Sequence, residues 1–204
     1  MLSTMTASGT PTTGRHSGES VQRLMDAAVD AFADKGFHGT STRDIAARAN
    51  LSPAGVYVHF ASKQDLLFQL CQRGHALALD VVVTARESAG TAPTQLAAIV
   101  SAFACWHAEH YRTARIVQYE FPHLTPEHRD EVLAVRKQID AVVTDVLRAG
   151  VASGDFDVPD VAVTTLALQS LTIDVARWYA PGMRRTPQAI GALYGDLALR
   201  LVRA

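Results

Sequence analysis

The stretch NLSPAGVYVHFASKQDLL, residues 50–67, contains two helix starts within about ten residues. Ser52 is a natural N-cap, and Pro53 suits the first helical position because its missing N–H needs no partner there. Ser62, with Asp65 three residues later, predicts a second start of the capping-box type. The helix between the two starts is too short to bury much apolar surface, so stability alone does not explain it. We therefore expect this short helix to present a surface to a binding partner.

Two more helices are predicted before this stretch. The first carries an apolar face at helical spacing and ends at Gly36. The second begins after Ser41, which can cap together with Asp44. A turn at Asn50–Leu51 then leads into the short helix, and this order is typical of a helix-turn-helix. In that motif the N-terminal end of the last helix enters the major groove of DNA.

The side chains around this turn are suited to DNA contacts. Small residues at the start of the short helix let its backbone approach bases and phosphates, and its first N–H groups point toward anions. Tyr57, His59 and Lys63 offer groups that can reach phosphate oxygens. Thr42 and Arg43 begin the second helix and are placed to contact the neighbouring phosphate. Arg43 could also donate hydrogen bonds to the edge of a guanine base. The predicted DNA-contacting residues are Thr42, Arg43, Ser52, Pro53, Ala54, Gly55, Tyr57, His59 and Lys63.

The composition is that of a globular chain. Its 204 residues are nearly half apolar, and 19 Lys and Arg balance 20 Asp and Glu, which argues against binding nucleic acid through a strongly basic surface but allows a local basic footprint. No apolar run approaches the length of a bilayer span, so no membrane partner is expected. Cys71 and Cys105 fall in apolar segments, which favours buried thiols and a cytoplasmic location over a disulfide framework. The Ser/Thr/Gly-rich segment 1–17 lacks the apolar core of a signal peptide and is expected to be a disordered tail.

Helical periodicity continues to the end of the chain and predicts an all-α fold of about nine helices. After the helix that starts near Ser62, the expected helices lie near 94–109, 112–121, 125–152, 160–179 and 187–202. The seam between a small N-terminal unit and a larger bundle is expected near Ser62–Leu67. The predicted domains are the tail 1–17, a helix-turn-helix DNA-binding domain 18–64, and a ligand-binding and dimerisation domain 65–204.

The segment STRDIAARANLSPAGVYVHFASKQDLL resembles the DNA-binding part of the tetracycline-repressor (TetR) family. The positions that fall on the family pattern are Thr42, Ile45, Ala46, Gly55, Tyr57, His59, Phe60, Lys63 and Leu66. The resemblance implies a homodimeric transcription factor, usually a repressor, that binds a pseudo-palindromic operator. It also implies a dimer interface formed by the last two helices. A small molecule that enters the C-terminal bundle and moves the fourth helix would release the DNA.

Both C-terminal functions suggest candidate residues, with an ordinary core as the alternative. The apolar stripes of the last two helices predict dimerisation through Leu171, Val175, Trp178, Ile190, Leu193, Tyr194, Leu197 and Leu201. The ligand-binding candidates are Phe103, Trp106, Tyr119, Phe121, Arg177 and Trp178, together with Tyr111. The segment ARWYAPG, 176–182, weakly resembles family members that respond to acyl-CoA thioesters. In the alternative interpretation, Arg177 pairs with Asp174 and Trp178 fills core, and the effector is another apolar or amphipathic molecule.

No catalytic residue, cofactor or metal site is predicted. His107 and His110 could provide two metal ligands, but no third ligand follows at helical spacing, which favours a polar face. Cys105 has no nearby cation in the sequence to activate its thiol. An enzyme remains as a rival because an all-helical site could bind a thioester, although no nucleophile–base pair stands at a telling spacing. Two further rivals are a helical interaction protein and a transcriptional activator of the same fold.

Overall fold

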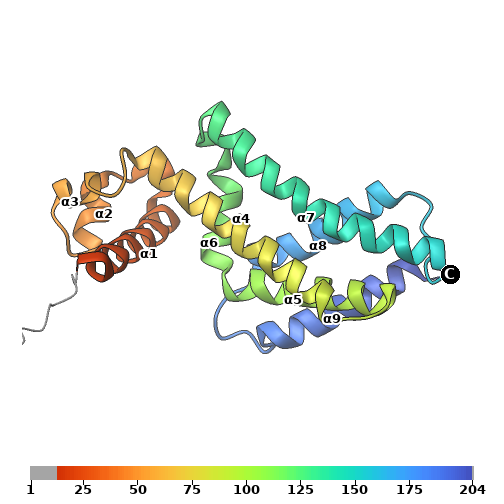
Figure 1. The fold of residues 1–204 in the computed structure, drawn as a ribbon. Coiled ribbons are helices and arrows are strands. Elements are labelled where there is room, and N and C mark those ends of the chain that lie inside the picture. Colours follow the sequence, from red (N-terminus) through yellow and green to blue (C-terminus); the bar gives the residue numbers. More distant parts are fainter. Residues whose placement is uncertain (1–12, 204) are drawn as a thin grey trace, which may run out of the picture. The chain divides into compact units, whose positions relative to one another are not determined.

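A computed structural model describes residues 13–203 of the chain, and over that range the fold is all-α, as predicted. The described residues form nine α-helices and one short 3-10 helix, and they contain no strand. The chain divides into two compact units, Met1–Leu66 and Leu67–Ala204, with the division inside helix α4 (Lys63–Glu87) (Figure 1).

The first unit contains α1 (Thr13–Gly39), α2 (Thr42–Arg48), α3 (Pro53–Tyr57) and the start of α4. Helix α1 begins inside the segment that was expected to be a tail, whose residues 1–12 lie outside the described range. The helix is broken at Gly36, where φ is 69° and ψ is 171°, in the region that glycine adopts most readily. Its regular part therefore ends at the residue that the sequence indicated.

The short helices of the first unit are fixed by caps, ion pairs and a small core. Asp44 accepts from the Ser41 backbone N–H and pairs with Lys35 at 2.9 Å, while Arg48 pairs with Asp34 at 2.8 Å. The hydrogen bond with the Ser41 side chain and the pairing with Lys35 hold the pKa of the Asp44 carboxyl well below its usual range. The buried apolar residues of this unit are Leu24, Met25, Ala27, Ala28, Ala31, Phe32, Phe37, Ile45, Ala46, Ala49, Val56, Phe60 and Leu66.

The second unit is a helical bundle built around α5. Its elements after α4 are α5 (Ala92–Glu109), α6 (Tyr111–Tyr119), the 3-10 helix η1 (Phe121–His123), α7 (Pro126–Ser153), α8 (Val161–Trp178) and α9 (Pro187–Val202). Helix α5 packs against α7, α8 and α9, and α6 packs against α8. The largest core cluster contains Val82 of α4, Leu96, Ile99 and Phe103 of α5, Val146 and Leu147 of α7, Leu168 of α8 and Val202 of α9.

Two glycines allow α9 to lie unusually close to α5 (Figure 1). A Cβ atom built on Gly191 would come within 2.5 Å of the Ser101 carbonyl oxygen, and one on Gly195 within 2.9 Å of the Ala97 carbonyl oxygen. Real side chains do not reach such distances, so the contact between these two helices depends on glycine at both positions.

Helix α4 differs from the expectation that no segment could span a bilayer. By length and composition alone it qualifies as a span, with a mean hydropathy of 1.2 over its most apolar window. Many of its apolar side chains are nevertheless packed inside the protein, although Leu77 is 46% exposed. The buried ones are Leu66, Leu67, Phe68, Leu70, Ala78, Val82 and Ala85.

Candidate DNA-binding surface and ligand cavity

The turn between α2 and α3 is held by a Schellman-type end to α2. Asn50 has φ 54°, a left-handed conformation that asparagine tolerates better than most residues. The Leu51 N–H donates to the Ala46 carbonyl at 2.9 Å, and the Asn50 N–H donates to the Ala47 carbonyl at 3.2 Å. This turn sends the chain directly into α3, whose N-cap Ser52 accepts from the Gly55 N–H at 3.1 Å.

Helix α3 turns one apolar residue inward and leaves its outer side to solvent. Val56 is fully buried, whereas Pro53, Ala54 and Tyr57 are exposed. A Cβ atom at Gly55 would meet only ordinary contacts, the nearest being the Ser52 hydroxyl at 3.5 Å. The fold itself therefore does not require glycine at this position. Glycine also does not stabilise the helix, because it is the poorest helix former after proline.

The remaining predicted DNA contacts lie on the same unit. Thr42 and Tyr57 bring their hydroxyl oxygens within 3.2 Å, so the start of the second helix and the end of the third are linked directly. Arg43 is exposed and His59 is half-buried. Val58 is 77% exposed at the end of α3, and sequence reasoning did not include it among the contacts. An exposed apolar side chain there could contact a thymine methyl group.

Lys63, which the sequence predicted as a phosphate contact, binds backbone carbonyls of its own unit. Its ammonium group donates to the Phe37 carbonyl at 2.6 Å and to the Thr40 carbonyl at 2.7 Å, and it lies 4.3 Å from the centre of the Phe37 ring. The side chain thus binds the segment that follows the break in α1. A residue whose donors satisfy backbone carbonyls is a structural clamp first, so the phosphate role predicted for Lys63 has no support in this geometry.

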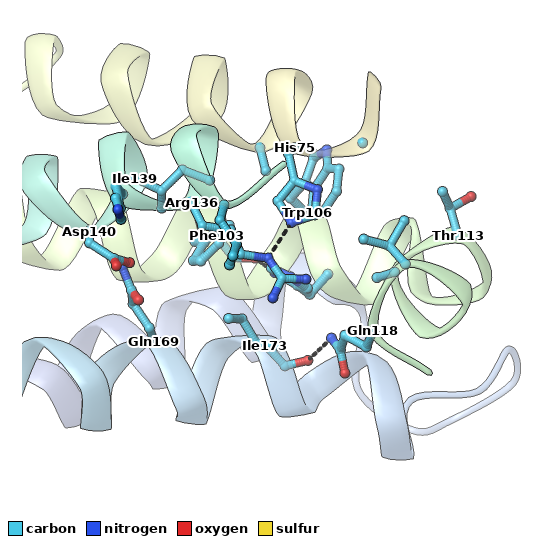
Figure 2. A pocket seen from close by; sticks show the side chains of 17 residues that line it. His75, Phe103, Trp106, Thr113, Gln118, Arg136, Ile139, Asp140, Gln169 and Ile173 are labelled. Carbon is cyan, nitrogen blue, oxygen red and sulfur yellow. Dashed lines mark hydrogen bonds between the residues drawn. The ribbon is translucent and has the colours of Figure 1, made fainter. Parts of the chain in front are cut away.

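The second unit encloses a cavity of about 420 Å³ between helices α4 to α8, within the usual range of small-molecule sites. Figure 2 shows its walls. Apolar side chains dominate the lining, and a few polar groups reach into it from different helices. The polar lining residues are His75, His107, Thr113, Gln118, Arg136, Lys137, Asp140 and Gln169.

Of the predicted ligand-binding residues, only Phe103 and Trp106 line this cavity. Arg177 is exposed and paired with Asp174 at 2.6 and 2.8 Å, and Trp178 packs on a small cluster around Val175, as the alternative interpretation expects of these two side chains. The other aromatic candidates also lie elsewhere. Tyr119 is 57% exposed, Phe121 stacks beneath the Arg136 guanidinium at 4.3 Å, and Tyr111 contacts Tyr179.

The polar side of the cavity is organised around Arg136 and His75. Arg136 Nε donates to His75 Nε2 at 2.8 Å, and because guanidinium only donates, the His75 proton must be on Nδ1, which donates to the Cys71 carbonyl at 2.7 Å. Burial lowers the pKa of His75 to about 4. His107 donates from Nδ1 to the Phe103 carbonyl, and burial lowers its pKa to about 4 as well. Both imidazoles are therefore neutral near neutral pH.

Sequence reasoning missed these polar residues, although a signal was present. Arg136 stands in the buried stripe of α7 that also contains Val132, Ile139 and Val143. Gln169 is a polar residue on the buried face of α8. A charged or amide side chain within an apolar stripe indicates a buried polar function more directly than an aromatic residue does, because its burial has an energetic penalty.

The comparisons with known proteins agree with this architecture. Residues 24–70 match the family described as bacterial regulatory proteins, tetR family, and residues 89–202 match the tetracyclin repressor-like C-terminal domain. The chain belongs to the TetR family. The transcriptional repressor KstR2 of Rhodococcus jostii is 30% identical over 193 residues, with 90% of this chain and 92% of that protein covered.

Solved structures of TetR-family proteins share the fold. A tetR-family regulatory protein from Rhodococcus RHA1 is 37% identical, with a TM-score of 0.85 and coverage of 91% of this chain and 97% of that chain. AibR, solved in complex with isovaleryl coenzyme A and operator DNA, is 20% identical, with a TM-score of 0.78 and coverage of 90% and 98%. At that identity, the second likeness shows the fold alone.

The predicted dimerisation residues of this TetR-family chain separate into two groups. Val175 and Ile190 are buried with Ala104 and Ala108 inside the bundle, so they belong to the core and cannot meet a partner, and half-buried Trp178 and Tyr194 pack against the same cluster. The other four predicted residues are exposed, together with two apolar residues of α8 that were not among the predicted set. This exposed set comprises Val163, Leu166, Leu171, Leu193, Leu197 and Leu201.

The remaining candidate centres are ordinary packing positions. Burial raises the pKa of the Cys71 thiol to about 12, and burial together with Glu109 raises the pKa of Cys105 to about 11, so both are protonated thiols. The His110 ring lies beside Trp106, with 5.0 Å between the ring centres. Among the described residues, no three side chains of metal-ligating type gather at one place.

Proposed function

We propose that this TetR-family regulator is a homodimeric transcriptional repressor that acts in the cytoplasm. In this proposal, each protomer places α3 in the major groove of one half of a pseudo-palindromic operator. A small apolar or amphipathic effector enters the C-terminal cavity and releases the DNA, with acyl-CoA thioesters as the first class to test.

The observation that carries the DNA-binding role is the solvent side of α3. Its exposed residues are not needed for the core of the first unit, and Gly55 has room for a methyl group that the fold would accept. The absence of a side chain at a position where packing does not require it favours close approach of the α3 backbone to another molecule. The helix-turn-helix placement of this surface favours the major groove of DNA as that molecule.

Two features support the dimer and the effector. The exposed leucines of α8 and α9 would leave several large apolar side chains in water on a monomer, and soluble proteins usually cover such a surface. The cavity has the size and the mostly apolar lining of a small-molecule site. AibR, whose fold is the same, has been solved with a coenzyme A thioester and operator DNA bound.

The test is fluorescence anisotropy of the full chain with DNA that flanks its own gene, at physiological salt and over excess random competitor. Saturable binding that survives the competitor and is lost on addition of one acyl-CoA thioester supports the repressor and its effector class. Binding that ignores the whole thioester panel removes the effector class. Absence of specific binding to any DNA in a genome-wide pull-down would contradict the DNA-binding role.

Substitution Gly55→Ala sharpens this test. We expect operator affinity to fall by roughly tenfold or more, because the new methyl group holds α3 away from the groove. Thermal stability should stay the same or rise slightly, because alanine is the better helix former and has space here. Gly90→Ala is the matched control, since a Cβ there meets nothing within 4 Å in the second unit. Unchanged affinity in Gly55→Ala would remove α3 from the interface.

A further inference from the structure

The cavity of the second unit contains a cation without an anionic partner. Arg136 reaches into it from α7, and Figure 2 shows the guanidinium between His75 of α4 and Ile173 of α8. Its Nε group donates to His75, and its face lies 4.3 Å from the centre of the Phe121 ring. Among the described residues no carboxylate pairs with it, so the two terminal nitrogens have no acceptor from the chain.

The neighbouring titratable groups do not neutralise this cation. His75 already uses both ring nitrogens and is neutral, and His107 is neutral with its Nδ1 bound to a backbone carbonyl. Lys137 adds a second positive charge to the lining. Asp140, one turn after Arg136, is exposed to solvent and forms no ion pair with it, so its charge offsets only part of the penalty. Burial lowers the pKa of Arg136, which shows that its charge is poorly compensated.

A second polar group points to the same kind of ligand. Gln169 of α8 lines the cavity and is only 9% exposed, and its side-chain amide nitrogen has no hydrogen-bond partner among the described residues. Buried amides in proteins are nearly always paired, so an unpaired donor beside an empty space indicates an acceptor that comes from outside the chain. Figure 2 shows Gln169 extending from α8 toward Asp140 of α7, at the end of the cavity where Ile139 of α7 also lies.

The rest of the wall selects the body of the ligand. The apolar lining includes Phe103, Trp106, Val117, Leu133, Ile139 and Ile173. Together these side chains can cover an alkyl or alicyclic skeleton but offer it no hydrogen bonds. A ligand that satisfies the whole cavity must therefore combine an apolar body with one strong acceptor group.

We infer that the ligand of this cavity carries a carboxylate at its buried end, which binds the terminal nitrogens of Arg136, and that an oxygen atom of the ligand accepts a hydrogen bond from the Gln169 amide. This inference rests on the proposed role of the cavity as the effector site. Arginine binds carboxylate through two parallel N–H bonds, which a single carbonyl or hydroxyl oxygen cannot reproduce. The carboxylate can come from a free fatty or alicyclic acid, or from an acyl-CoA thioester whose acyl group ends in a second carboxyl.

Calorimetric titration of the full chain with four matched probes tests the inference. The probes are decanoate, 1-decanol, decanoyl-CoA and the coenzyme A thioester of ω-carboxynonanoic acid. We expect decanoate to bind about tenfold more tightly than 1-decanol, and the ω-carboxyl thioester about tenfold more tightly than decanoyl-CoA, because only the carboxylates pair with Arg136. The tighter of the two carboxylates identifies the source.

Variants separate the contact from the fold. Arg136→Met keeps much of the length of the side chain and should abolish both preferences, while Arg136→Lys should keep part of them because the charge remains. Gln169→Leu should weaken the carboxylates by a smaller factor. Arg148→Met, on the exposed side of α7, is the control and should keep both preferences in full. Thermal melting of each variant shows that it is folded.

The inference is overturned if neither carboxylate binds more tightly than its matched probe without that carboxylate, or if the preference persists in Arg136→Met. Operator binding is measured separately on the same samples. If operator DNA is bound and then released by 1-decanol or decanoyl-CoA without any carboxylate preference, the proposed repressor stands and only the carboxylate is removed.

Discussion

The ammonium group of Lys63 donates to the carbonyl oxygens of Phe37 and Thr40 and lies against the Phe37 ring. Its position in the motif, directly after the short helix, suggested a phosphate contact because the sequence contains no information on which carbonyls lie nearby. The break at Gly36 creates those carbonyl acceptors by ending the regular part of α1. The contacts of Lys63 are therefore determined by the end of a helix at Gly36, 27 residues earlier in the sequence.

Substitution Lys63→Met should lower the free energy of unfolding by about 1–3 kcal/mol, because two carbonyls lose a charged donor. Urea unfolding measures this, with Arg148→Met on the exposed side of α7 as the control. If stability is unchanged and the salt dependence of operator binding flattens by about one charge, Lys63 is a phosphate contact after all.

The neutral histidines of the second unit predict a pH dependence. Burial lowers the pKa of His75 from an ordinary value of 6.5 to about 4, so the unfolded chain binds a proton more readily than the folded chain between these values. Stability is therefore complete above about pH 6.5 and falls as the pH drops toward 4, by about 3 kcal/mol for such a group. His107 acts in the same direction.

Urea unfolding near pH 7 and near pH 5 checks the sign. We expect the chain to be less stable at the lower pH, and the difference to shrink in His75→Gln. A stability that stays constant or rises as the pH falls through this window would show that His75 is protonated in the folded chain.

At the scale of the element, the helix starts could be predicted because their signals are local. Ser41 and Ser52 cap the helices that the sequence assigned to them, with side-chain bonds to backbone N–H groups at 3.1 Å. Thr125 and Thr186 cap α7 and α9 in the same way, at 3.2 Å. The end of the helix expected near 112–121 differs from the prediction by two residues. Helix α6 ends at Tyr119 and the chain passes into a 3-10 turn at Phe121–His123, since Pro122 cannot continue the α-helix.

The contact between α5 and α9 gives a prediction at the same scale. Gly191→Ala should lower the free energy of unfolding by about 1–3 kcal/mol, because the new Cβ must displace the backbone carbonyl of Ser101. Thermal or urea unfolding measures the loss, and Gly90→Ala shows the effect of a glycine substitution in open space. An equal change in both variants would mean that the two helices separate without strain.

At the scale of the whole molecule, the sequence predicted an apolar surface on the last two helices and a ligand cavity, but it did not identify all the residues that form them. Periodicity made α8 apolar on nearly all sides, and it could not say which side the bundle covers. Leu168 and Val175 face the core, whereas Leu166 and Leu171, on the same helix, face solvent. The ligand cavity was predicted from aromatic residues, yet Arg136 and Gln169 reach it because α7 and α8 lie beside α5. Such contacts between distant segments have no local signal.

The exposed residues of α8 and α9 make the proposed dimer testable. Leu197→Glu should convert dimer to monomer in sedimentation experiments and reduce operator affinity, because a charge would be buried in an apolar interface. Val151→Glu, which places the same charge on an exposed apolar position of α7, should leave the mass unchanged. If Leu197→Glu sediments like the unmodified chain, this face is not the dimer interface.

The position of Trp106 in the cavity wall has a practical consequence. The chain contains two tryptophans, and the other one, Trp178, packs on the cluster around Val175 and does not line the cavity. Indole emission depends on the polarity of the surroundings, so replacement of Trp178 by phenylalanine would leave a single tryptophan, at the ligand site. In such a protein, ligand binding could be followed as a change in the wavelength or intensity of tryptophan emission, without an attached label and without DNA.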